Sequence, residues 1–127
     1  MLQPSARTED DATTVSSIDP TRIMSEETAL KLQKLMRATV EHGTAKEAAP
    51  ILAPTGWTMG GKTGTGPQPG SNKAGPASDG CFVGLIFDPQ LRARFTVVTF
   101  VSHGGFGGGN AARISAELGR WLAEMPE

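Results

Sequence analysis

The chain has 127 residues, 38% of them hydrophobic, and a formal net charge of −1. This length accommodates one domain but not two, and the near-zero charge gives no electrostatic reason to expect binding to nucleic acid or to a membrane surface. No apolar run reaches the ~18 residues of a membrane-spanning helix and no secretory leader is recognisable. The single cysteine, Cys81, excludes a disulfide within the chain.

The first 22 residues are polar, and we expect an irregular segment over 1–22 with at most a weak strand at 14–18. The domain itself is expected over 23–127. It opens with a predicted helix from Ser25 to His42, because Ser25 suits an N-cap and Gly43 suits the exit. One face of this helix repeats apolar residues at helical spacing, namely Leu32, Leu35, Met36, Thr39 and Val40.

Three strands and a second helix follow. The strands are predicted over 56–65, 81–87 and 94–101, with a Gly/Pro/Ser/Asn loop over 66–80 and a hairpin connection at 88–92. After a glycine-rich joint at 104–109, Asn110 is expected to cap a helix that ends at Pro126. Its predicted core face comprises Ile114, Leu118, Trp121, Leu122 and Met125.

This order predicts an α+β fold in which an antiparallel sheet, three strands of it in this chain, is flanked by helices. Because the second and third strands are almost continuously apolar, we expect the sheet to be buried on both faces.

The strand at 56–65 carries the most informative motif, Gly61-Lys62-Thr63-Gly64-Thr65. Lys62 supplies a positive charge, and in an extended segment Thr63 and Thr65 point to the same side. Gly64 lets a ligand approach the main chain without a Cβ in the way. These groups suit the binding of a small carboxylate through charge-assisted hydrogen bonds.

The same letters also satisfy a phosphate-binding pattern, since residues 56–63 read G-x4-G-K-T. A P-loop needs a helix directly after the threonine, so that the helix N-terminus faces the phosphate. Here Pro67 and Pro69 follow among glycines, and Pro50 and Pro54 interrupt the stretch where the preceding strand should be. A nucleotide-binding domain is therefore the weaker interpretation.

Four segments in order resemble the penicillin-binding protein transpeptidase family, of the class B type. The lysine strand resembles the family's Lys-Thr-Gly box. Residues 24–44 resemble the helix that precedes this strand in the family. Asp79-Gly80-Cys81-Phe82-Val83-Gly84 resembles the opening of the next strand, with Cys81 in place of the usual tryptophan. Gly107-Gly108-Gly109-Asn110-Ala111-Ala112 resembles the glycine-rich lead into the last helix. The resemblance implies the C-terminal part of such a domain.

The family's other two boxes are absent from these 127 residues. None of the eight serines has a lysine three positions later, and none begins S-x-N. Ser71-Asn72-Lys73 has its lysine too close, and Ser78-Asp79-Gly80 lies after the lysine strand. The resemblance therefore implies that the serine nucleophile and two strands that pair with the last strand belong to a missing N-terminal part of the same domain, and that this chain alone is inactive.

By resemblance, Lys62 and Thr65 are the catalytic residues, and Lys62, Thr63, Gly64 and Thr65 bind substrate. The threonine hydroxyls would hold the terminal carboxylate of a peptidoglycan stem peptide or a β-lactam. The Thr65 N–H would form half of an oxyanion hole, and Lys62 would assist proton movement. The parent protein would act outside the cytoplasm, with no cofactor, no metal and no membrane contact by this segment. A β-lactam sensor or a class D-like β-lactamase remains open as an alternative.

Other chemically interesting residues have structural interpretations. His103 is expected to be a solvated loop histidine and Cys81 a small buried apolar residue. Trp57 and Trp121 are expected to pack in the core. The acidic run Glu9-Asp10-Asp11 is a solvated patch, since no further ligand lies at metal-binding spacing.

Overall fold

A computed structural model of the chain describes residues 20–67, 70 and 77–126. The predicted strand at 14–18, the acidic run at 9–11 and Ser71-Asn72-Lys73 lie outside these residues. The elements, in chain order, are α1 (Glu26–Glu41), a 3₁₀ turn (Lys46–Ala48), α2 (Ala49–Leu52), a 3₁₀ turn (Ala53–Thr55), β1 (Thr58–Thr65), β2 (Gly80–Phe87), β3 (Ala93–Val101) and α3 (Asn110–Glu124).

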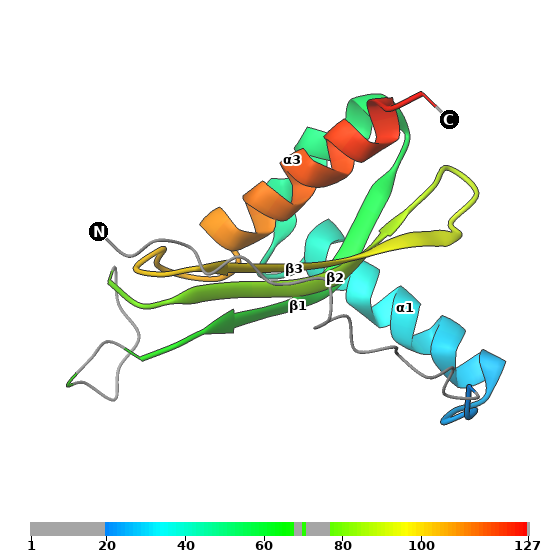
Figure 1. Ribbon diagram of the computed structural model, residues 1–127, viewed down its shortest axis with the longest axis horizontal. Coiled ribbons are helices and arrows are strands. Elements are labelled where there is room, and N and C mark those ends of the chain that lie inside the picture. Colours follow the sequence, from blue (N-terminus) through cyan, green and yellow to red (C-terminus); the bar gives the residue numbers. More distant parts are fainter. Residues whose placement is uncertain (1–19, 68–69, 71–76, 127) are drawn as a thin grey trace, which may run out of the picture.

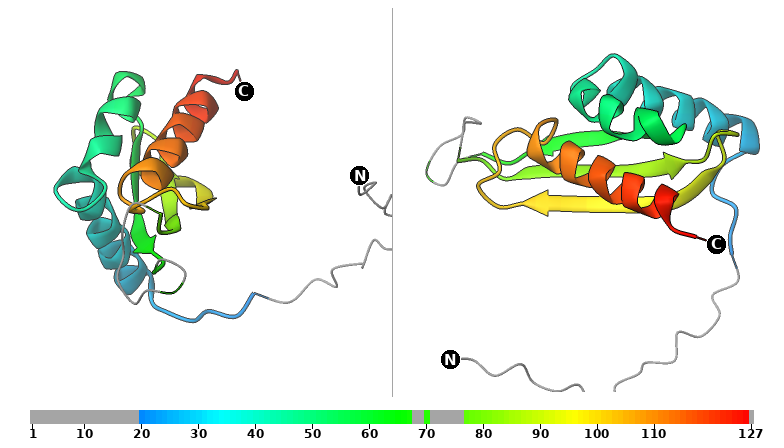
Figure 2. Two further views of the ribbon diagram at one scale, coloured as in Figure 1. Left: turned by 90° about the vertical axis from the view of Figure 1, so that its left-hand side faces the viewer. Right: turned by 90° about the horizontal axis from the view of Figure 1, so that it is seen from above.

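The three strands form one antiparallel sheet in the order β1-β2-β3. α3 lies on one face of this sheet and α1 on the other, while the turns around α2 connect α1 to β1 (Figure 1, Figure 2). The predicted α+β arrangement of an antiparallel sheet flanked by helices is confirmed.

The first helix begins and ends where its capping residues indicate. The Ser25 hydroxyl accepts a hydrogen bond from the Thr28 N–H at 3.1 Å, and Glu26 and Glu27 occupy the positive end of the helix. β1 begins at Thr58 rather than Gly56. Gly56 has a φ of 75° and ends the preceding turn, a conformation that glycine adopts without strain.

Burial of the sheet differs between its two faces. On the α3 side Met59, Phe82, Ile86 and Val97 are all 4% exposed or less. On the α1 side Val83, Val98 and Phe100 are 43%, 67% and 64% exposed, because α1 packs chiefly against β1. Burial on the α1 side is confined to the part of the sheet under α1, where Phe87 is 0% exposed with the Arg37 guanidinium over its ring. The prediction of a sheet buried on both faces is therefore only partly correct.

α1 approaches β1 through a glycine. A Cβ on Gly60 would lie 2.6 Å from the Arg37 backbone nitrogen, so the two backbones are in contact there. The helix is buried only near this point: Val40 is 2% exposed, whereas Leu32 and Leu35 are 46% and 69% exposed. The predicted apolar face of α1 is thus packed at its C-terminal end and open at its N-terminal end.

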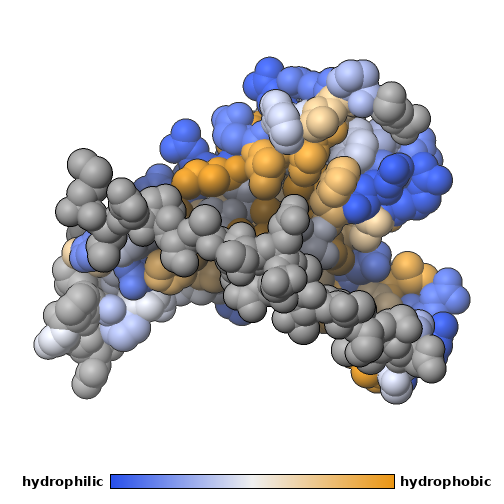
Figure 3. All heavy atoms as spheres, viewed as in Figure 1, coloured by the Kyte–Doolittle hydropathy of each residue, from blue (hydrophilic) through white to orange (hydrophobic). Residues whose placement is uncertain are grey.

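α3 packs through small residues, which contradicts the predicted core face. Ile114, Leu118, Trp121 and Met125 are exposed, and of the predicted set only Leu122 packs against the core. The buried positions are Ala111, Ala112, Ser115, Ala116 and Gly119. A Cβ on Gly119 would lie 3.0 Å from Ile86 Cδ1, so the helix lies too close to the sheet for large side chains. The exposed apolar stripe is visible over α3 in Figure 3.

Asn110 also behaves differently from the prediction. It is the first residue of α3, Gly109 precedes the helix as N-cap, and no side chain caps the helix. The Asn110 side-chain amide instead donates to the Gly104 carbonyl at 3.0 Å and fastens the glycine-rich joint. Trp121, predicted to be a core residue, is 59% exposed.

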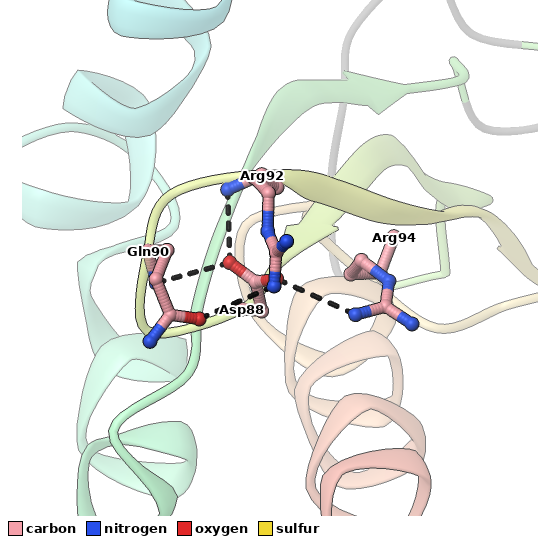
Figure 4. Close-up of polar contacts among 4 residues, drawn as sticks. All are labelled: Asp88, Gln90, Arg92 and Arg94. Carbon is pink, nitrogen blue, oxygen red and sulfur yellow. Dashed lines mark hydrogen bonds and ion pairs between the residues drawn. The ribbon is translucent and has the colours of Figure 1, made fainter. Parts of the chain in front are cut away.

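The β2–β3 hairpin is organised by a buried carboxylate, Asp88, which is 2% exposed. One of its oxygens accepts the backbone N–H groups of Gln90 and Arg92 at 3.0 Å each, and the other accepts Arg92 Nε at 2.8 Å and an Arg94 guanidinium N–H at 3.4 Å (Figure 4). Burial acts to raise the pKa of Asp88, but the hydrogen bonds and the charge of Arg92 outweigh it and hold the pKa below its ordinary value. Leu91 closes the turn with a φ of 61°.

The lowered pKa of Asp88 predicts a stability contribution that disappears in acid. A folded-state pKa below the ordinary 3.8 stabilises the fold above that pH and ceases to do so as the pH falls through the folded value. We expect Asp88→Asn to lower the urea midpoint at neutral pH and the difference from the parent chain to narrow below about pH 4. Glu47→Gln, a change at an exposed carboxylate, is the control. If the urea midpoint of Asp88→Asn stays below that of the parent chain by the same amount at every pH, the loss of stability comes from altered packing and not from the charge of Asp88.

The unpaired edge of β3 predicts self-association of the isolated chain. Among the residues that the structure describes, β3 pairs with β2 alone. It also exposes Val98 and Phe100, so it offers unpaired backbone groups beside apolar side chains. We expect oligomers in sedimentation velocity at micromolar concentration, reduced by Val98→Lys but not by Leu30→Lys on α1. A monomer of the parent chain that unfolds cooperatively would contradict this expectation.

Candidate functional site: the edge of β1

The motif residues lie on β1 with their side chains alternating between the two faces of the sheet. Thr63 and Thr65 pair in register with Phe82 and Gly80 and share the face that α3 covers. Both threonines line one pocket, so the expectation that they point to the same side is confirmed. Lys62 lies between them in sequence and therefore on the other face.

The pocket on the α3 side has a volume of about 410 Å³. It is lined by Thr44, Lys46, Glu47, Thr63, Thr65, Phe106, Gly108 and Gly109. It thus combines three hydroxyls, one cation, one anion and the side chain of Phe106, which is 61% exposed. Hydroxyl donors beside a lysine suit an anionic group of small size.

Each threonine hydroxyl of the motif is held by a distant segment. Thr63 Oγ1 lies 2.9 Å from Thr44 Oγ1, just after α1, and Thr65 Oγ1 accepts the Gly107 N–H at 3.2 Å. These approaches depend on glycines. A Cβ on Gly107 would overlap the Gly64 and Cys81 carbonyl oxygens, and one on Gly108 would overlap the Thr44 carbonyl oxygen.

Lys62 opens onto a second groove of about 410 Å³, between α1 and the sheet. Leu32, Leu35 and Val83 line this groove, and the Lys62 ammonium donates to the Thr63 carbonyl at 2.5 Å. Because Lys62 and the threonines lie on opposite faces, a ligand that contacts all three must lie across the outer edge of β1. β1 occupies an edge of the sheet, so this side of the strand faces away from β2.

The family model of the penicillin binding protein transpeptidase domain matches residues 1–119. The chain belongs to this family. No curated protein and no solved structure matches it. Transpeptidase domains of this family bind peptidoglycan or β-lactams in general, and they generally act outside the cytoplasm. Among the helices that the structure describes, none is long and apolar enough to cross a membrane.

The structure disfavours the nucleotide-binding alternative. Lys62 and Thr63 lie in the middle of an eight-residue strand, whereas a P-loop threonine opens a helix. Over the described part of the chain, no group of three His, Cys, Asp or Glu side chains is placed to hold a metal ion.

The remaining singled-out residues do not line the pocket beside Thr63 and Thr65. His103 is exposed, and its backbone N–H donates to the Asp79 carboxylate at 2.9 Å. Cys81 is a free, half-buried thiol on β2 rather than a fully buried one. Trp57 packs as expected, with its ring stacked on Phe95 at 6.2 Å between centroids.

The assignment of site residues from sequence missed six of the residues that line the pocket, namely Thr44, Lys46, Glu47, Phe106, Gly108 and Gly109. It also missed Gly107, whose N–H donates to Thr65. Thr44 and Gly107 fall within segments that resemble the family, but nothing in their spacing placed them beside the threonines. They lie 19 residues before Thr63 and 42 after Thr65, and only the fold brings them together.

The fit of Gly107 against two carbonyl oxygens predicts that the site tolerates no side chain there. We expect Gly107→Ala to destabilise the chain by about 1–3 kcal/mol, because a Cβ would displace the loop from β1 and β2. Gly66→Ala is the matched control, since its Cβ would meet nothing nearer than 3.5 Å. Urea unfolding monitored by circular dichroism measures both, and equal midpoints would show that the loop does not depend on this close approach.

Proposed function

We propose that this chain is the carboxylate-binding portion of a D,D-transpeptidase domain that cross-links peptidoglycan. In this proposal Thr63 and Thr65 donate hydrogen bonds to the terminal carboxylate of a D-Ala-D-Ala peptide or to the carboxylate of a β-lactam. The observation that carries the proposal is the shared pocket of the two hydroxyls, together with the Gly107 N–H on Thr65. A backbone N–H only donates, so this bond leaves the hydroxyl hydrogen of Thr65 available for an anion.

Lys62 and Gly64 have complementary roles in the proposal. A substrate lying along the outer edge of β1 meets no side chain at Gly64, so its backbone can approach the strand. Lys62 reaches the same edge from the opposite face and supplies positive charge where a proton is transferred during acylation. The Thr65 N–H would be one donor of the oxyanion hole.

The nucleophile of the reaction would come from another segment of the same domain, because these 127 residues contain no S-x-x-K pair. Open apolar surfaces support the existence of such a segment. They comprise the α3 stripe, the groove beside Lys62 and the edge of β3: Ile114, Leu118, Trp121, Leu32, Leu35, Val83, Val98 and Phe100. A sensor or class D-like β-lactamase would use the same strand, and the segment that carries the nucleophile would distinguish them.

The proposal predicts reversible binding without acylation. We expect the chain to bind N-acetyl-D-Ala-D-Ala more tightly than the same peptide with a C-terminal amide, measured by ligand-observed NMR. Thr63→Val or Thr65→Val should remove most of this preference, since an unpaired charged partner costs about 1–3 kcal/mol, or roughly 5- to 150-fold in Kd. A fluorescent penicillin should leave no covalent adduct detectable by intact mass.

The experiment remains interpretable if the chain associates through β3. β1 and β3 occupy opposite edges of the sheet, so pairing at β3 leaves the pocket beside β1 accessible. Equal affinity for acid and amide would overturn the assignment of the strand as a carboxylate site. A stoichiometric acyl adduct would overturn the assignment of the nucleophile to another segment.

A further inference from the structure

We infer that Thr44 is a positioning residue of the carboxylate site, acting through the hydroxyl of Thr63. This inference rests on the proposed function and adds a residue to it. Thr44 Oγ1 and Thr63 Oγ1 are 2.9 Å apart, and both residues line the same pocket. Either hydroxyl can donate in the absence of a ligand.

Binding of a carboxylate fixes the direction of this hydrogen bond. An ionised carboxylate is only an acceptor, so a hydroxyl that binds it must use its single hydrogen for that purpose. Thr63 can then only accept from Thr44, and Thr44 becomes the donor. The bound state is a chain of donors from Thr44 to Thr63 to the carboxylate, in which each hydrogen bond polarises the next. Thr44 thereby makes the hydroxyl group of Thr63 a better-oriented and stronger hydrogen-bond donor.

The backbone of Thr44 is held firmly enough for this role. On its α1 side, the Ala45 N–H donates to the Thr39 carbonyl at 3.1 Å and Ala45 is fully buried. On its other side, the Thr44 carbonyl packs against Gly108, where a Cβ would overlap it. The Thr44 side chain therefore originates from an exposed turn whose backbone is packed between the end of α1 and the glycine-rich joint.

The arrangement also gives the two threonines of the motif equivalent support. Thr65 accepts from the Gly107 N–H, and with a carboxylate bound Thr63 accepts from the Thr44 hydroxyl, so in the bound state both are left to donate into the pocket. The support differs in one respect. The Gly107 N–H is always a donor, whereas the Thr44 hydroxyl is fixed as the donor of its hydrogen bond only when Thr63 donates to a bound acceptor. Thr44 therefore responds to the charge of the ligand and should contribute to selectivity for an acid over an amide.

The test is a double-mutant cycle on the affinity for N-acetyl-D-Ala-D-Ala and for its C-terminal amide. We expect Thr44→Val to weaken binding of the acid roughly 2- to 10-fold, the range of one neutral hydrogen bond, with a smaller effect on the amide. Thr44→Ser should restore the parent affinity because it keeps the hydroxyl. In a Thr63→Val background, Thr44→Val should have no further effect. Thr96→Val, at an exposed threonine on β3, is the control for the loss of a hydroxyl.

The outcomes separate this inference from the proposed function. If the parent chain does not prefer the acid, the proposed function itself fails. If the parent chain prefers the acid but Thr44→Val binds it equally well, only the role of Thr44 is overturned. Effects of Thr44→Val and Thr63→Val that add independently also overturn it, because they would mean that Thr44 acts on the ligand directly or on the fold. Melting temperatures are measured for all variants, and unchanged values show that the differences in affinity do not come from unfolding.

Discussion

The structure depends on close approaches between elements at glycines. Gly60 lets α1 rest on β1, Gly119 lets α3 rest on Ile86, and Gly107 and Gly108 let the joint before α3 lie against β1, β2 and Thr44. These contacts set the distance of each covering element from the sheet. In α3 the same distance determines which side chains are buried, because the helix lies so close to the sheet that its fully buried positions are all glycine, alanine or serine.

This constraint explains why the sequence predicts the elements better than their packing. Alternation and turn residues located all three strands, and Ser25 located the start of α1. The buried face of α3 was predicted wrongly, because hydropathy favours the stripe through Leu118 and Trp121 over the neighbouring stripe of small residues. Both stripes have helical spacing. The choice between them depends on Gly119, which packs against Ile86, and that contact is not visible in the sequence.

The candidate site, too, is predictable from the sequence only in part. Alternation along an extended strand was enough to place Thr63 and Thr65 on the same side of it. The partners of those hydroxyls were not predictable, since Thr44 and Gly107 reach them across 19 and 42 residues of chain. Local sequence pattern identifies the candidate ligand-binding groups, whereas the groups that orient them follow from how closely distant segments approach.

The three segments that meet at the pocket connect the site to the core. Thr44 is adjacent to Ala45, and Gly107 lies shortly before Ala111 and Ala112. The three alanines are fully buried. The hydroxyls of Thr63 and Thr65 are therefore oriented by elements whose positions are fixed by core packing. Lys62 has no such support, because its groove is open and its apolar walls, Leu32, Leu35 and Val83, are partly exposed. A segment that covered those walls would order Lys62 at the edge of β1, where the threonines are already in place. Under the proposed function, the groups that would anchor the carboxylate thus all lie within this chain, whereas the chemistry proposed for Lys62 would require a further surface.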